Sequence, residues 1–224
     1  MAGSAPLKIT TRSGTVRVVA AAGSELAVEG GTIDLLDDGT IHIRRERSSN
    51  VIDVRCPLGS DVTVGTASGK VELLGALGTV RVATVSGRIH VAEADRIDLR
   101  TKSGKVDIEA CAGECRIMTK SAAVHVGRAD RATVAVVSGI VLLERVRGAE
   151  VKTVSGKVLV GSTGGERISV HTVSGKVEIR VPAATRPATR LRSLSGKIQC
   201  DLSPGDDFEV AVVSVSGAIR VSSA

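Results

Sequence analysis

Aromatic residues are almost missing from this chain of 224 residues, which has one phenylalanine, Phe208, and neither tryptophan nor tyrosine. A core without aromatic rings has to be filled by aliphatic side chains and is therefore narrow. Their absence also removes the platforms on which proteins stack the bases of single-stranded nucleic acids. Lysine and arginine number 30 against 24 aspartate and glutamate, a net charge of +6. This excess is not densely clustered, so the sequence does not favour nucleic acid as a partner.

Long apolar runs and export signals are also missing. No basic stretch followed by an apolar one opens the sequence. No later segment approaches the ~18 uninterrupted apolar residues of a membrane-spanning helix. The sequence therefore predicts no transmembrane segment and a cytoplasmic location, with association to the cell envelope open through a partner.

A Ser-Gly dipeptide returns along the chain and is mostly followed by a cation and then by valine or isoleucine. The nine copies stand 17 to 21 residues apart and begin at Ser68, Ser86, Ser103, Ser121, Ser138, Ser155, Ser174, Ser195 and Ser216. Ala122 replaces the glycine in one of them. A fixed period in this range is typical of stacked structural units.

Aligning the copies on this serine predicts which side chains face the core. The third residue after it is always valine or isoleucine, and the fifth is apolar, with cysteine in one copy. The fourth residue before it is apolar too, so the inward-facing parity changes by one residue across Ser-Gly. Because such a shift exchanges the two faces of a strand, we expect Ser-Gly to form a corner or bulge between two strands.

The repeat predicts an all-β fold. Equivalent strands of successive copies would pair in parallel, and the rest of each coil would be a crossover, which is nearly always right-handed. We therefore expect a right-handed parallel β-solenoid, or β-helix-like fold, of about nine coils over residues 59–224. Residues 1–58 would add N-terminal strands and a hairpin cap to this one continuous domain. The hairpin is expected over residues 33–44, turning at Asp38-Gly39.

The C-terminal end of the repeat shows no comparable cap. The last copy is therefore expected to leave an unpaired strand edge. Three apolar residues near that edge, Val212, Ile219 and Val221, are the candidates for self-association or for contact with a protein partner.

The segment PLGSDVTVGTASGKVEL at residues 57–73, followed by serial Thr-x-Ser-Gly-x-Val segments, resembles the bacterial family labelled putative adhesin, a domain of unknown function. The resemblance covers most of the chain, including the expected hairpin. It implies a β-solenoid fold and a bacterial source. It implies no catalytic residues.

Cations recur two residues after the corner serine, on the outward parity, and would form a ladder along the coils. The candidates are Lys70, Arg88, Lys105, Lys157, Lys176 and Lys197. Such a ladder could bind a polyanion, namely an anionic polymer, an acidic lipid surface or a nucleic acid. The alternative is a solvated face that keeps the protein soluble.

Two further clusters have both a metal-binding and a structural interpretation. His90, Asp107 and His125 follow one another on an outward column, where they would share a metal or simply alternate in charge. Cys111 and Cys115 form a Cys-x3-Cys pair without the second pair or nearby histidine of a zinc site. Cys115 aligns with core positions, as does Cys200. The sequence predicts neither metal nor cofactor, and small buried thiols instead.

Enzyme signatures are not found in the sequence. The stretch from Gly65 to Val71 lacks the glycine spacing of a phosphate-binding loop, and no Gly-x-Ser-x-Gly elbow occurs. The function predicted is therefore a non-enzymatic scaffold or interaction protein that binds a protein partner or itself. The alternatives are a polyanion-binding module and, with less support, a carbohydrate-active enzyme.

Overall fold

The computed structural model describes residues 6–23, 25–45 and 50–223. The rest of the predicted N-terminal cap, at residues 1–5, 24 and 46–49, lies outside the described residues. Within the described ranges the chain forms strands and turns and no helix. The fold is all-β and β-solenoid-like, as the sequence predicts. By compactness the chain divides into unit 1, Met1–Ala112, and unit 2, Gly113–Ala224.

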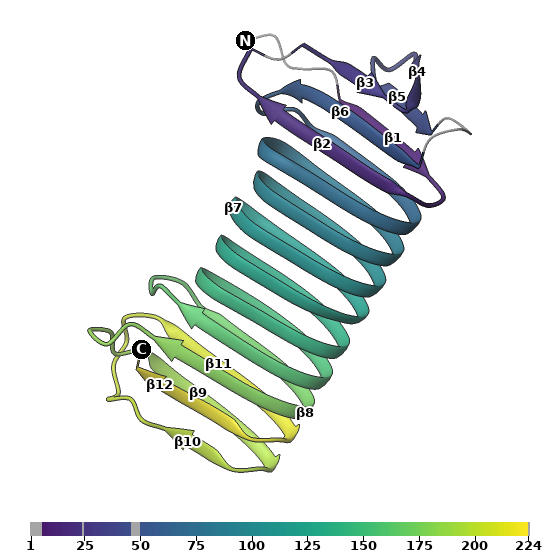
Figure 1. Cartoon of the computed structure of the whole chain (residues 1–224). Coiled ribbons are helices and arrows are strands. Elements are labelled where there is room, and N and C mark those ends of the chain that lie inside the picture. The colour runs from purple at the N-terminus through teal and green to yellow at the C-terminus, as the bar shows by residue number, and fades with distance from the viewer. Residues whose placement is uncertain (1–5, 24, 46–49, 224) are drawn as a thin grey trace. The chain divides into compact units, whose positions relative to one another are not determined.

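Within the described residues, twelve strands belong to one hydrogen-bonded sheet. Unit 1 contains β1 (Leu7–Thr11), β2 (Thr15–Ala21), β3 (Ala27–Glu29), β4 (Gly31–Leu35), β5 (Ile41–Arg45), β6 (Val51–Pro57) and the first part of β7 (Val62–Ser162). Unit 2 contains the rest of β7 and then β8 (Ile168–Val181), β9 (Ala188–Ser195), β10 (Ile198–Cys200), β11 (Glu209–Ser216) and β12 (Ile219–Ser223). Figure 1 shows β7 as a ribbon that winds through successive turns.

In unit 1 the Ser-Gly dipeptides form the corners of the coils. In unit 1 the φ angles of Gly69, Gly87 and Gly104 are +148°, +147° and +130°. A Cβ atom on Gly87 would overlap the carbonyl oxygen of Gly69, and one on Gly104 would overlap that of Gly87. Positive φ and this close approach of stacked backbones both require glycine, so the predicted corner is confirmed.

Side chains on either side of the corner fill the core of each unit. In unit 1 the residues three and five positions after the serine are almost completely buried, as at Ile89 and Val91. The hydroxyl two residues before the serine closes the corner from inside: Thr101 Oγ1 donates to the carbonyl oxygen of Ser103 at 3.0 Å. Thr66 and Thr84 make the same bond at the corners of Ser68 and Ser86, so these three corners of unit 1 each satisfy a backbone carbonyl.

The predicted hairpin is present in unit 1. β4 pairs antiparallel with β5 in the register Ile33↔Ile43, and the turn closes where the Gly39 amide donates to the Leu36 carbonyl at 3.0 Å. β3 pairs antiparallel with β6. The coil formed by β1 and β2 lies inside this cap, since β1 pairs with both β5 and β7, and β2 pairs with both β6 and β7.

The strand order at the C-terminal end of unit 2 differs from the chain order. β11 pairs in parallel with β8 on one side and β9 on the other. β12 likewise lies between β8 and β10. The connection after β10 returns the chain, and Asp207 holds it where its Oδ2 accepts the Arg186 amide at 2.7 Å. The last copy of the repeat, which contains Ser216, therefore lies in the sheet between the copies that contain Ser174 and Ser195.

This insertion corrects two expectations. Val212, Ile219 and Val221 do not lie at an unpaired edge, because β11 and β12 have a partner strand on each side and bury all three side chains. Cys200, expected in the core, is exposed because it lies on the outermost strand, β10. The other three cysteines are buried.

Candidate functional site

The cation ladder is continuous in unit 1 and interrupted in unit 2. Lys70, Arg88 and Lys105 are exposed on three corners whose glycines stack in the order 69, 87, 104. In unit 2, Lys157 lies beside Lys176. The expected third member, Lys197, is separated from Lys176 by β12, whose Ala218 takes the intervening place. The predicted row of three in unit 2 is therefore wrong.

Carboxylates next to the ladder partly neutralise it. Lys70 Nζ lies 2.5 Å from Glu72 Oε1, and Lys176 pairs with Glu178 in the same way. The lysine hydrogen bond holds the pKa of each glutamate below its ordinary value. These pairs reduce the positive field that Lys70 and Lys176 present to an anion. The rest of the field of the ladder comes from Arg88, Lys105 and Lys157.

The two histidines of the expected line both lie near carboxylates. In unit 1, His90 Nδ1 lies 3.9 Å from Asp107 Oδ2, and its Nε2 lies 3.4 Å from Glu109 Oε1. In unit 2, His125 Nε2 lies 2.9 Å from Glu144 Oε1. Over the described ranges, no group of three or more histidine, cysteine or acidic side chains is arranged to hold a metal ion.

An exposed row of valines crosses unit 2 at the position just before the corner serine. These side chains are 45 to 49% exposed, and we call Val137, Val154, Val173 and Val215 the valine ridge. Val154 lies beside Val173, and Val173 beside Val215, in the parallel registers that join β7, β8 and β11. Val137 precedes the corner on which Gly156 stacks. The ridge is therefore contiguous.

The same position in unit 1 does not form a ridge. Val85 is 46% exposed there, but its equivalents on the adjoining coils are Ala67 and Lys102. A contiguous apolar strip on a folded surface marks an interaction site more often than scattered apolar residues do. Reasoning from the inward columns missed the ridge, although the outward valines recur at a fixed place in the repeat.

The exposed end of unit 2 is formed by β9 and β10. Among the described residues each has one partner strand, β11 and β12 respectively, so the other edge of each is unpaired. Leu194 on β9 is 84% exposed, and Ile198 on β10 is 41% exposed. The sequence had predicted an open edge on the last copy of the repeat, whereas the structure has it on the copy before, which contains Ser195.

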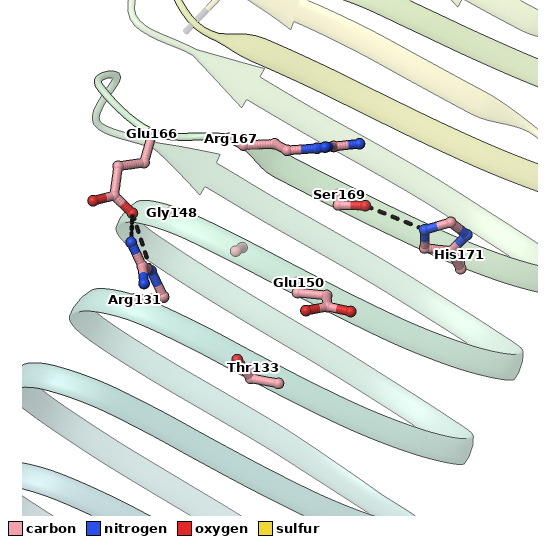
Figure 2. A pocket seen from close by; sticks show the side chains of 9 residues that line it. Arg131, Thr133, Gly148, Glu150, Glu166, Arg167, Ser169 and His171 are labelled. Carbon is pink, nitrogen blue, oxygen red and sulfur yellow. Dashed lines mark hydrogen bonds and ion pairs between the residues drawn. The ribbon is translucent and has the colours of Figure 1, made fainter.

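A pocket of about 580 Å³ opens on the outer face of unit 2 (Figure 2). Glu166 overhangs it from the connection between β7 and β8, and a Cβ atom on Gly148 would come within 2.7 Å of the Glu166 Oε2. Arg131 Nη2 and Arg147 Nη2 hold the two carboxylate oxygens at 2.8 and 2.9 Å. The glycine thus leaves the space in which this ion-pair cluster forms.

The other acid in the pocket, Glu150, is also paired. Its Oε1 lies 2.7 Å from Lys152 Nζ, and this hydrogen bond lowers the Glu150 pKa. A glycoside hydrolase needs an acid with a raised pKa to protonate the leaving group, whereas the pKa of Glu150 is lowered. Ser169 and His171 also line the pocket, and the Ser169 Oγ lies 3.2 Å from the His171 Nε2. The pocket has the chemistry of a polar binding surface.

The stacked corners, the parallel registers and the absence of helices from the described residues define a repeat protein of the β-solenoid-like class. Within that class, the chain belongs to the Toastrack DUF4097 family, whose model matches residues 38–222. No curated protein matches it. No helix in the described part of the chain is long and apolar enough to cross a membrane.

Three solved structures titled putative adhesin share the fold at 11% sequence identity. For the protein from Bacteroides fragilis the TM-score is 0.52, covering 99% of this chain and 94% of that one. For Parabacteroides merdae the values are 0.55, 97% and 92%, and for Parabacteroides distasonis 0.58, 98% and 94%. The likeness shows the fold, over nearly the whole length of both chains.

Proposed function

We propose that this chain is a non-enzymatic interaction protein of the adhesin type, which binds a protein partner through the valine ridge of unit 2. The observation that carries the proposal is the contiguity of four half-exposed valines on neighbouring coils. Burying the exposed half of one valine contributes on the order of 1 kcal/mol, so the ridge offers about 4 kcal/mol to a partner that covers it. Cell-envelope association through such a partner belongs to the same proposal.

The scaffold behind this surface, in our proposal, is a right-handed parallel β-solenoid with a hairpin cap and one coil for each of the nine corner serines. A backbone fixed by stacked corners holds the ridge side chains in place before the partner arrives. Such preorganisation lowers the entropic cost of binding.

Site-specific photo-cross-linking in the native host tests the ridge. A photoreactive residue at Val154 should capture a defined protein, whereas the same residue at Val85, equally exposed at the equivalent place in unit 1, should not. Val154→Asp with Val173→Asp should weaken binding of the captured protein at least about a hundredfold, because two apolar contacts are lost and two carboxylates are desolvated. Val85→Asp is the matched control. Equal capture from both positions would refute the proposal.

The second candidate function is polyanion binding by the intact ladder of unit 1. Lys70, Arg88 and Lys105 are exposed on consecutive corners. Binding to a heparin column should fall steeply with salt, and Arg88→Glu with Lys105→Glu should abolish it. Retention unchanged by this pair of substitutions would exclude the ladder as the binding site.

A further inference from the structure

The outer edge of unit 1 is acidic. It consists of β3, β4 and the hairpin turn, and each of the two strands has one partner strand among the described residues. Residues 25–38 carry five acids and no base, namely Glu25, Glu29, Asp34, Asp37 and Asp38. Ile33 and Leu35 are 52 and 74% exposed between these acids. We call residues 25–38 the acidic edge.

The outer edge of unit 2 has the opposite charge. Residues 186–200, which contain β9 and β10, carry Arg186, Arg190, Arg192 and Lys197 and no acid. Arg190 is engaged by Glu209 at 3.0 Å, while Arg192 and Lys197 are exposed on the outermost coil. Leu194 and Ile198 add exposed apolar surface. We call residues 186–200 the basic edge.

The two edges are also built alike. The acidic edge joins the three-residue strand β3 to the five-residue strand β4 across Gly30, whose φ is +74°. The basic edge joins the eight-residue strand β9 to the three-residue strand β10 across Gly196. Each edge thus offers unpaired backbone on one longer and one shorter strand, with exposed leucine and isoleucine between charges of one sign.

We propose that the partner of each edge is the other edge of a second copy of this chain, so that copies associate head to tail. Unpaired strand edges associate through backbone hydrogen bonds, and opposite charges across the contact select the partner and its register. A head-to-tail contact uses two different surfaces and leaves one of each kind free on a pair of chains, so it can continue to larger assemblies.

Contact between two identical edges is disfavoured. Two basic edges would bring Arg192 and Lys197 against their own copies, and two acidic edges would do the same with Glu29 and Asp37. Like charges opposed across strands are destabilising. The proposed contact uses the strand edge of β9 and β10, whereas the ridge lies on the outward face of β7, β8 and β11, so the contact can fail while ridge binding holds, and the reverse.

A charge-exchange experiment on the full chain tests the proposal. Sedimentation velocity over a range of concentrations at low salt should show reversible association of the unsubstituted protein, weaker at high salt. Arg192→Glu with Lys197→Glu changes the basic edge from four cations to two cations and two acids, with no net charge, and Glu29→Lys with Asp37→Lys changes the net charge of the acidic edge from −5 to −1. Each variant alone should have a dissociation constant at least about a hundredfold higher. An equimolar mixture of the two should associate again, because the intact acidic edge of one variant meets the intact basic edge of the other.

Lys120→Glu with Arg145→Glu is the matched control, since it reverses two exposed cations of unit 2 outside the basic edge and should leave association unchanged. Restored association in the mixture supports the proposal and also shows that both variants are folded. A strictly monomeric unsubstituted protein at all concentrations would overturn it. Association that survives the substitutions in either edge would overturn it equally, by assigning the contact to another surface.

Discussion

The stacking of the corner glycines predicts a loss of stability on substitution that can be measured directly. Replacing Gly87 by alanine forces a side chain into a backbone with φ of +147° and places its Cβ against the carbonyl oxygen of Gly69. The positive φ costs an alanine about 1–2 kcal/mol. Forcing a methyl group into close-packed structure costs about 1–3 kcal/mol more. We therefore expect Gly87→Ala to reduce the free energy of unfolding by about 2–5 kcal/mol, a large part of a domain's usual stability.

Two other glycines separate these contributions. Gly39 has φ of +78° in the hairpin turn but no atom within 4 Å of its absent Cβ, so Gly39→Ala should cost only the conformational part. Gly65 has neither a positive φ nor a close neighbour, since the nearest atom is 4.0 Å away. Gly65→Ala should therefore be neutral or slightly stabilising, because alanine restricts the unfolded chain.

The stability of all three variants can be measured by urea unfolding. Circular dichroism in the far ultraviolet is the probe, because the chain has no tryptophan or tyrosine for fluorescence. The midpoint should fall most for Gly87→Ala and less for Gly39→Ala, with an unchanged slope. A Gly87→Ala midpoint no lower than that of Gly39→Ala would refute the argument that stacked backbones exclude a Cβ atom at the corner.

Three further predictions concern thiols, pH and the pocket. Native protein should expose one fast-reacting thiol, Cys200, and Cys200→Ser should remove the fast phase, because Cys56 is buried and its pKa is raised by that burial. Lys70→Met should make stability less sensitive to acid: Glu72 has a folded pKa below its ordinary 4.5, so its contribution is complete above that value and is lost as the pH falls through the lowered one. Comparing urea midpoints at pH 7 and at about pH 3 checks this. Gly148→Val should displace Glu166 and speed amide exchange in residues 163–167, whereas Thr133→Val on the same pocket should not.

The local rules of the repeat were readable from the sequence because each one recurs in every coil. The change of parity across Ser-Gly predicts the corner, and the columns beyond it predict buried residues such as Ile89. The hairpin at Asp38-Gly39 was readable for a similar reason, since two short apolar runs flank a turn dipeptide. In each case the signal lies within about one coil of chain.

The stacking order at the C-terminal end was not readable from the same signals. The copies at Ser195 and Ser216 have the same apolar columns, so either could follow the copy at Ser174 without changing the core pattern. The choice depends on the connection at residues 201–207, which allows the last copy to return between its predecessors. The copy displaced to the outside carries Cys200 where the others carry valine, isoleucine or leucine, and this less apolar position is the one hint that the sequence offers.

The valine ridge is not explained by the demands of the fold. At the position before the corner serine the side chain points outward and stays exposed whatever its type, as Lys102 and Lys120 show on two other coils. Lysine at that place is compatible with the same corner in unit 1, where Gly104 keeps its positive φ. Valine has the higher strand propensity, but propensity differences span only about 1 kcal/mol and apply equally in both units. An apolar strip confined to unit 2 therefore points to a requirement outside the fold, and a partner that covers the strip would supply one.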